Sequence, residues 1–187
     1  MKTLLIGHSF YSRMDQTLQS RRWLLGPYGV ELLCRPGATL DFVPPNDRLP
    51  AGPFDKVIMN LLDNEIYSKH QERRSNNTEI LSKLEVTVSR LQSHYPEAEI
   101  FVDLVHMRDW SPEWLAMARL LNREVVGLAA VRGFRYISSE LTVPPYGNFS
   151  FFKQAFDWSL VCPDRVHLSG RGECLLLRSL LLTLSGS

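Results

Sequence analysis

The chain has 187 residues, a formal net charge of +1, 44% hydrophobic residues and 22% charged residues. This length and composition predict one globular domain, residues 1–187, that is large enough to bury a full core. The near-zero net charge excludes a general electrostatic attraction to nucleic acid or to an anionic membrane surface. The longest apolar stretch, 175–182, is interrupted by Arg178 and is far shorter than the roughly 20 residues of a membrane helix.

The cysteines and the N-terminal region bear on the compartment of the protein. Cys34, Cys162 and Cys174 are odd in number and lack metal-ligand spacing, which predicts buried thiols in a reducing environment rather than a disulfide framework. The apolar run at 4–6 is too short for a signal peptide, and no small-residue cleavage site follows it. We therefore expect an intracellular, cytoplasmic location.

The first candidate element is the run Thr3-Leu4-Leu5-Ile6-Gly7. A short apolar run that ends at glycine is typical of a buried parallel strand. Ser9 follows two positions later, where an amphipathic helical pattern begins that extends to about residue 25. Because ligands bind beyond the carboxyl ends of strands in open α/β sheets, and helix N-termini attract negative charge, Ser9 is a candidate for chemistry.

Four further apolar runs alternate with helical patterns. The expected strands are 30–34, 56–62, 100–105 and 134–137. Between and after them, helices are expected from Thr78 to Tyr95, from Ser111 to about Val131, and from 170 to 184. Ser111 followed by Pro112 is typical of a helix start. This alternation predicts a three-layer α/β/α sandwich with a five-stranded parallel sheet, whose carboxyl ends meet at one rim.

Polar residues follow several of these strands. Ser9 comes after the first strand, the Gly37 turn after the second and Asn64 after the third, while Asp164 and His167 precede the last helix. Acyl transfer needs a nucleophilic hydroxyl, an imidazole base, a carboxylate that orients it, and donors for the oxyanion. The spacing of Asp164 and His167 permits both side chains to face one site, although the same spacing is common in surface pairs.

Taken in this order, these short sequence segments, here called blocks, resemble the conserved blocks of the SGNH hydrolase family, also called GDSL-like esterases. The resemblance rests on Gly7-His8-Ser9, Gly37, Asn64 and Asp164-Arg165-Val166-His167, and covers nearly the whole chain. It implies a flavodoxin-like sandwich with strand order 2-1-3-4-5. It also implies hydrolysis of a carboxylic ester, acetyl or short-acyl, without a cofactor.

The same resemblance assigns roles to these residues. Ser9 would be the nucleophile, His167 the base and Asp164 the residue that orients His167. The backbone N–H groups of Ser9 and Gly37 and the side chain of Asn64 would form the oxyanion hole. The expected partner is a small-molecule ester.

Two positions depart from the family pattern. His8 stands where the first block usually has Asp, and Leu62 stands where the third block usually has Gly. A leucine at 62 could displace Asn64, and a small misplacement can cost on the order of a hundredfold in rate. The alternative inward-facing groups after the third strand are Asn60 and Asp63.

Other histidines are secondary candidates. His8 and His106 could line the pocket, with a structural role for His106 as the alternative. The five histidines contain no H-x-H or HExxH pair, so no metal site is expected.

Gly-His-Ser-Phe followed by Arg13 also resembles a divergent SGNH group. It includes esterase-like domains carried by retrotransposons and the OSK domain of Oskar, in which the catalytic residues are lost and RNA is bound. Ser9, Asp164 and His167 are all present here. The alternative to an esterase is nevertheless a weak or inactive module that binds RNA or a protein, suggested by the altered blocks and by Arg13, Arg21 and Arg22. A flavodoxin-type nucleotide binder is a third option, disfavoured by the absence of a phosphate loop.

Overall fold

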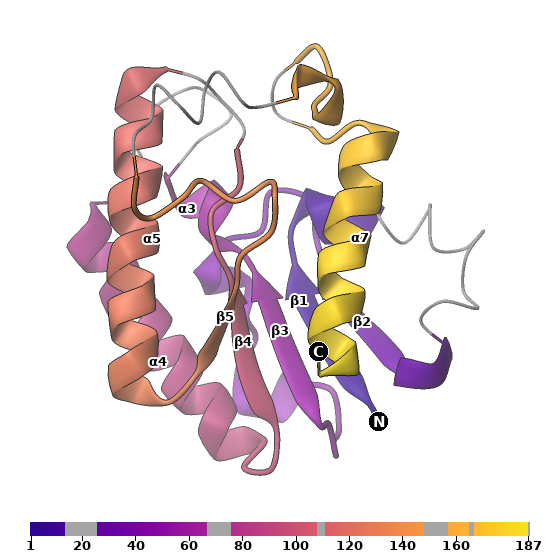
Figure 1. The fold of residues 1–187 in the computed structure, drawn as a ribbon. Coiled ribbons are helices and arrows are strands. Elements are labelled where there is room, and N and C mark those ends of the chain that lie inside the picture. Colours follow the sequence, from indigo (N-terminus) through magenta and orange to yellow (C-terminus); the bar gives the residue numbers. More distant parts are fainter. Residues whose placement is uncertain (14–25, 67–75, 108–110, 148–156, 165–166, 187) are drawn as a thin grey trace.

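The protein is built around a five-stranded parallel sheet of order β2-β1-β3-β4-β5 (Figure 1). The computed structural model describes residues 1–13, 26–66, 76–107, 111–147, 157–164 and 167–186. The strands are β1 (Thr3–Gly7), β2 (Val30–Cys34), β3 (Lys56–Asn60), β4 (Glu99–Asp103) and β5 (Arg135–Ile137). Both the sandwich architecture and the strand order expected from the sequence are confirmed.

Alternate residues of each central strand enter two separate cores. In β1, Leu4 and Ile6 belong to one core and Leu5 to the other, as the two-residue period of a strand requires. Helices α4 (Asn77–His94) and α5 (Pro112–Arg132) cover the first face of the sheet, and α7 (Gly170–Ser185) covers the second (Figure 1). Burial on both faces explains why the middle residues of β1, β3 and β4 are apolar.

Side-chain caps fix the start of each long helix. Ser111 Oγ accepts a hydrogen bond from the Trp114 N–H at 3.2 Å, and Pro112 occupies the first turn of α5, as the sequence predicts. Asn76 caps α4 and Ser169 caps α7 in the same way. Each cap satisfies one of the backbone N–H groups that a helix start leaves without an intrahelical partner.

Several predicted boundaries are wrong by one or two residues. The third strand was expected to reach residue 62, but β3 ends at Asn60 and a short helix, α3 (Leu62–Ile66), follows. Leu61 and Leu62 are buried in the core although they follow the end of the strand. The apolar run in the sequence is therefore longer than the strand. Within the described ranges, short 3₁₀ helices lie at η1 (Gly26–Tyr28), η2 (Leu40–Phe42), η3 (Asn46–Arg48) and η4 (Trp158–Leu160).

The helical pattern predicted after Ser9 is seen in part. Residues 9–13 are helical, whereas 14–25 lie outside the described residues. The expectation of buried thiols is wrong for Cys174, whose side chain is exposed on α7; Cys34 and Cys162 are partly buried. None of the helices in the described part of the chain is long and apolar enough to cross a membrane.

Helix α7 is anchored at both ends. At its C-terminal end, Lys56 Nζ donates to the carbonyl oxygens of Thr183 at 2.7 Å and Leu184 at 3.1 Å, which neutralises the negative end of the helix dipole. At its start, Gly172 lies so close to η4 that a Cβ built on it would come within 2.1 Å of the Leu160 carbonyl oxygen. A glycine is therefore needed for α7 to lie against η4.

Replacing this glycine should loosen the contact. We expect Gly172→Ala to lower the free energy of unfolding by about 1–3 kcal/mol, the usual cost of overpacking, measured by urea denaturation. The matched control is Gly170→Ala in the same turn, where a new Cβ meets nothing within 4 Å. Equal stability of the two variants would contradict this account of the α7–η4 contact.

Candidate active site at the carboxyl edge of the sheet

Ser9 lies where β1 passes into the helical residues 9–13. The Ser12 N–H donates to the His8 carbonyl oxygen at 3.0 Å, which makes His8 the N-cap residue of this helix. The ring of His8 completes the cap, because its Nδ1 accepts a hydrogen bond from the Phe10 N–H at 3.4 Å. Ser9 is therefore the first residue of the helix, and its own N–H has no acceptor within it.

The second and third blocks of the sequence meet beside this helix start. Gly37 has a φ of +75°, within a turn closed by a 3.0 Å hydrogen bond from the Ala38 N–H to the Arg35 carbonyl oxygen. Asn64, in α3, donates from Nδ2 to the Ala38 carbonyl oxygen at 3.0 Å. The structure thus joins the Asn64 side chain to the turn that contains Gly37. Leu62 is buried in the core at the start of α3.

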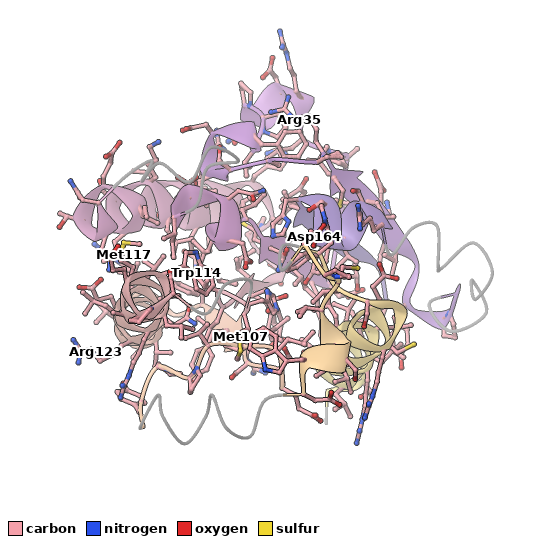
Figure 2. All side chains as sticks on the ribbon, turned by 90° about the horizontal axis from the view of Figure 1, so that it is seen from above. Arg35, Met107, Trp114, Met117, Arg123 and Asp164 are labelled. Carbon is pink, nitrogen blue, oxygen red and sulfur yellow. The ribbon has the colours of Figure 1, made fainter. Side chains whose placement is uncertain are left out.

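Asp164 and His167 form a pair at the same edge. Asp164 Oδ2 lies 2.7 Å from His167 Nδ1, and Asp164 Oδ1 accepts the His167 backbone N–H at 3.0 Å. The surrounding hairpin is held by the Val161–Leu168 bridge and by a 2.8 Å hydrogen bond from the Cys162 N–H to the His167 carbonyl oxygen. Figure 2 looks onto this edge of the molecule, with Asp164 labelled near the middle of the view.

Ser9 itself contacts a different histidine. Its Oγ lies 3.4 Å from His8 Nδ1. Among the residues that the structure describes, no hydrogen bond joins Ser9 to His167. The predicted base and its carboxylate are thus together, and the link from His167 to the nucleophile stays a prediction.

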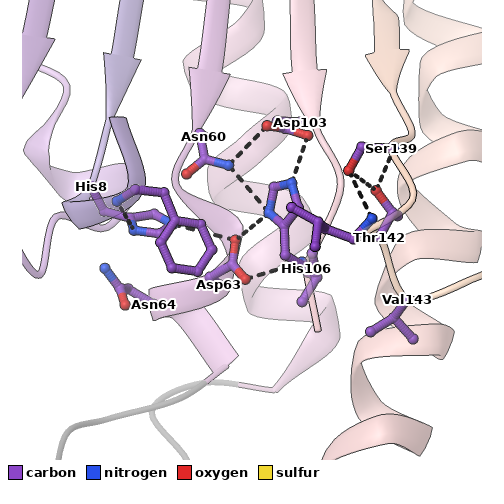
Figure 3. A network of polar contacts seen from close by, with 12 residues as sticks. His8, Asn60, Asp63, Asn64, Asp103, His106, Ser139, Thr142 and Val143 are labelled. Carbon is purple, nitrogen blue, oxygen red and sulfur yellow. Dashed lines mark hydrogen bonds and ion pairs between the residues drawn. The ribbon is translucent and has the colours of Figure 1, made fainter. Parts of the chain in front are cut away.

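A buried polar cluster that the sequence did not predict contains His8, the residue next to Ser9, together with Asp63 and His106 (Figure 3). Asp63 Oδ2 is 3.3 Å from His8 Nε2 and 3.3 Å from His106 Nδ1, so one carboxylate oxygen lies between two imidazoles. Its other oxygen accepts the backbone N–H of His106 at 3.0 Å. The three side chains are 0% exposed. His8 and His106, expected to line the pocket, lie instead in the interior.

A second carboxylate completes the cluster from β4. Asp103 Oδ1 lies 3.2 Å from His106 Nε2. Its Oδ2 accepts hydrogen bonds from the Tyr11 hydroxyl at 3.1 Å and from Asn60 Nδ2 at 3.0 Å. Asn60 and Asp63, the alternative inward-facing groups after the third strand, thus both belong to this cluster.

The cluster determines the charge of its members. Burial alone would lower the pKa of His106, but the carboxylates of Asp103 and Asp63 outweigh it and raise that pKa to about 10. Burial alone would raise the pKa of Asp63, but His106 and His8 hold it well below its usual range. Burial, and next the nearby Asp103, raise the pKa of Tyr11 well above its ordinary value. At neutral pH, His106 is therefore an imidazolium facing two carboxylates.

The segment that carries His106 is held on its other side by α5. Asn122 accepts the Val105 N–H at 2.8 Å and donates to the Val105 carbonyl oxygen at 3.1 Å and the Val143 carbonyl oxygen at 2.8 Å. His106 also forms a bridge with Thr142, whose hydroxyl accepts the Ser139 N–H (Figure 3). In the described ranges, no group of three or more His, Cys, Asp or Glu side chains is arranged to hold a metal ion.

No family model matches the sequence, and no curated protein matches it either. Solved structures do match. An α/β hydrolase from the metagenome of Lake Arreo, Spain, is 14% identical with a TM-score of 0.68, covering 99% of this chain and 94% of its own. A GDSL-like lipase from Bacteroides thetaiotaomicron is 11% identical with a TM-score of 0.69, covering 99% and 88%. The acetylxylan esterase Axe2 from Geobacillus stearothermophilus is 15% identical with a TM-score of 0.66, covering 100% and 94%.

The chain has an SGNH hydrolase fold. At identities this low the likeness establishes the fold alone. The link to retrotransposon domains and to RNA binding stays a prediction, because Arg21 and Arg22 lie outside the described residues and Arg13 is simply an exposed side chain.

Within this SGNH fold, the buried cluster had a signal in the sequence. Asn60 and Asp103 are polar residues at the carboxyl ends of strands whose middle residues are apolar. A buried polar side chain needs a hydrogen-bond partner, so two of them on neighbouring strands indicate a polar contact. The sequence could not show which partners they meet, because the contacts join residues 43 positions apart.

Removing the central cation should destabilise the protein. We expect His106→Gln to lower the free energy of unfolding at neutral pH by about 3–5 kcal/mol, because two buried carboxylates would lose their cation. The pKa of His106 is raised in the folded state, from 6.5 to about 10. Its contribution is therefore complete below pH 6.5 and lost as the pH rises through 10. The stability difference between wild type and variant should shrink over that range.

Urea denaturation at a series of pH values measures this difference. His94→Gln, at the end of α4, is the control that removes a histidine outside the cluster. A His106→Gln protein as stable as wild type at neutral pH, or a difference that does not change up to pH 10, would contradict the assigned charge.

Proposed function

We propose that the protein is a serine ester hydrolase that cleaves acetyl or other short-acyl carboxylic esters. In this proposal Ser9 is the nucleophile, His167 the base and Asp164 the residue that orients His167. The observation that carries the proposal is the Asp164–His167 pair. Asp164 holds both the ring Nδ1, at 2.7 Å, and the backbone N–H of His167, at 3.0 Å, so the imidazole is fixed with Nε2 left to serve as the base.

The proposed reaction has two stages. As Ser9 Oγ bonds to the ester carbonyl carbon, its proton passes to His167 Nε2 and the carbonyl electrons move onto oxygen. The ester C–O bond then breaks, and His167 returns the proton to the departing alcohol. In the second stage a water, deprotonated by His167, attacks the acyl carbon. The bond from Ser9 Oγ to that carbon then breaks, His167 returns the proton to Ser9 Oγ, and the acid is released.

The oxyanion needs donors that are in place before the reaction. In the proposal these are the N–H groups of Ser9 and Gly37 and the Asn64 amide. The placement of Ser9 at a helix start, where its N–H has no intrahelical acceptor, supports the first. The 3.0 Å hydrogen bond from Asn64 to Ala38 supports the other two, because it ties the amide to the Gly37 turn.

Esterase activity with Ser9 variants tests the nucleophile. The wild-type protein should hydrolyse p-nitrophenyl acetate, and Ser9→Ala should lower kcat by about 10³-fold or more. Ser12→Ala is the matched control, since it removes a serine hydroxyl one helical turn away, which donates to the Ser9 carbonyl oxygen. A Ser9→Ala protein as active as wild type would refute the proposed nucleophile. Faster turnover of decanoate than of acetate esters would refute the short-acyl assignment alone.

Asn64 provides a separate test of the oxyanion hole. Asn64→Ala should lower kcat by about 10²–10³-fold with little change in KM, because an oxyanion donor acts only when the charge develops. Urea denaturation of the same sample separates this effect from a loss of folding. An unchanged kcat with a higher KM would instead place Asn64 in substrate binding.

A further inference from the structure

Ser9 begins a second array of the Ser–His–Asp type, distinct from the one that the family pattern implies. Its Oγ lies 3.4 Å from His8 Nδ1, and the other ring nitrogen, His8 Nε2, lies 3.3 Å from Asp63 Oδ2. The imidazole thus stands between a hydroxyl and a carboxylate. His8 and Asp63 are 0% exposed, whereas His167 is 28% exposed and Asp164 is 50% exposed.

The cap of the first helix fixes the tautomer of His8. The Phe10 backbone N–H donates to His8 Nδ1 at 3.4 Å. Because an amide N–H only donates, Nδ1 must carry a lone pair, and the ring proton is on Nε2, where Asp63 accepts it. The Ser9 hydroxyl is then the donor in its contact with Nδ1. The positive end of the helix dipole also favours a neutral His8 in the resting state.

The buried cluster next to His8 stabilises the doubly protonated, imidazolium form of its ring. Asp63 and Asp103 act as carboxylates and His106 as an imidazolium, so with neutral His8 the buried cluster holds one net negative charge. Tyr11 and Asn60 contribute neutral hydrogen-bond donors. A proton transferred from Ser9 to His8 would bring the cluster to neutrality in a region of low dielectric, where an uncompensated charge is costly.

We propose that His8 is a second proton acceptor for Ser9 Oγ, with Asp63 as its carboxylate partner. The proposal rests on the proposed function only in taking Ser9 as the nucleophile. As the bond from Ser9 Oγ to the acyl carbon forms, the O–H proton moves to His8 Nδ1, and Nε2–H continues to donate to Asp63. When the ester C–O bond breaks, that proton passes to the departing alcohol oxygen.

NMR of the wild-type protein tests the contact without any need for activity. With ¹⁵N-labelled histidine, assigned through correlation to its own backbone, His8 should show a protonated Nε2 and an unprotonated Nδ1 at neutral pH. Ser9→Ala should shift the Nδ1 resonance, because it removes the hydroxyl donor. A proton on Nδ1, or a Nδ1 resonance that is the same in wild type and Ser9→Ala, would overturn the proposal.

Kinetics test the proton transfer. In the His167→Ala protein, residual p-nitrophenyl acetate hydrolysis should exceed that of Ser9→Ala, and adding His8→Asn should lower it by about tenfold or more. Asn is the matched substitution because its Oδ1 still caps the helix and accepts hydrogen bonds but is no base. Adding His94→Asn instead should leave the residual rate unchanged. If His167→Ala is as inactive as Ser9→Ala, or if His8→Asn has no further effect, His8 is not an acceptor.

The two proposals fail in different ways. A wild-type protein that hydrolyses no ester would refute the proposed function, and the NMR result would still decide the Ser9–His8–Asp63 array. An active protein with a Nδ1–H tautomer at His8 would leave the proposed function intact and refute the array. If His8→Asn does not fold, Asp63→Asn in the His167→Ala background replaces it. The amide keeps the shape of Asp63 but cannot stabilise the imidazolium, so the residual rate should again fall by about tenfold.

Discussion

The carboxylate of Asp63, buried between two imidazoles, connects the ends of three strands. Asp63 lies just after β3, and its carboxylate contacts His8, which follows β1, and His106, which follows β4. A buried carboxylate without such partners would cost several kcal/mol, so these segments depend on one another for their placement. Ser9 follows His8 and Asn64 follows Asp63 in the chain, and the position of both candidate catalytic groups therefore depends on this contact.

The unusual histidine at position 8 follows from the same contact. A helix start needs a side-chain acceptor, and Asp is the residue usually found in this block of the SGNH pattern. A carboxylate at position 8 would lie against the carboxylate of Asp63, and two like charges in the interior repel strongly. An imidazole accepts from Phe10 with one nitrogen and donates to Asp63 with the other. The residues at 8 and 63 therefore form a matched pair.

The sequence was sufficient for the architecture because the architecture follows from local patterns. Apolar runs, the Ser111-Pro112 helix start and the alternation of elements predicted the layers, and the family resemblance supplied the strand order. The local pattern gave a wrong strand end at Leu61 and Leu62. These two residues are apolar because they are buried in the core, although the strand has already ended. A run of apolar residues indicates that the segment is buried, and a buried segment can be a strand or the start of a helix.

The buried cluster could not be predicted for the opposite reason, because it depends on register. Gly7 pairs with Asn60, and Met59 pairs with Val102, so Asn60 comes beside Asp103 one step further along. A shift of one residue in either pairing would turn these polar side chains to the other face of the sheet. The sequence marks Asn60 and Asp103 as polar positions, but only the folded sheet shows that they meet.

Two separate sets of contacts, with no residue in common, position the two halves of the candidate site. Ser9, Gly37 and Asn64 lie on the rim of the sheet, which the buried charges of Asp63 and His106 hold together. Asp164 and His167 lie on a hairpin fixed to α7 by Ser169 and by the close contact of Gly172 with η4. The distance from Ser9 to His167 therefore depends on how α7 packs on the sheet. Ser9 to His8, by contrast, is a contact between neighbours in the chain, so it does not depend on the packing of α7. The two proposed acceptors of the Ser9 proton are thus positioned by different parts of the fold, His167 by the packing of α7 and His8 by the chain next to Ser9.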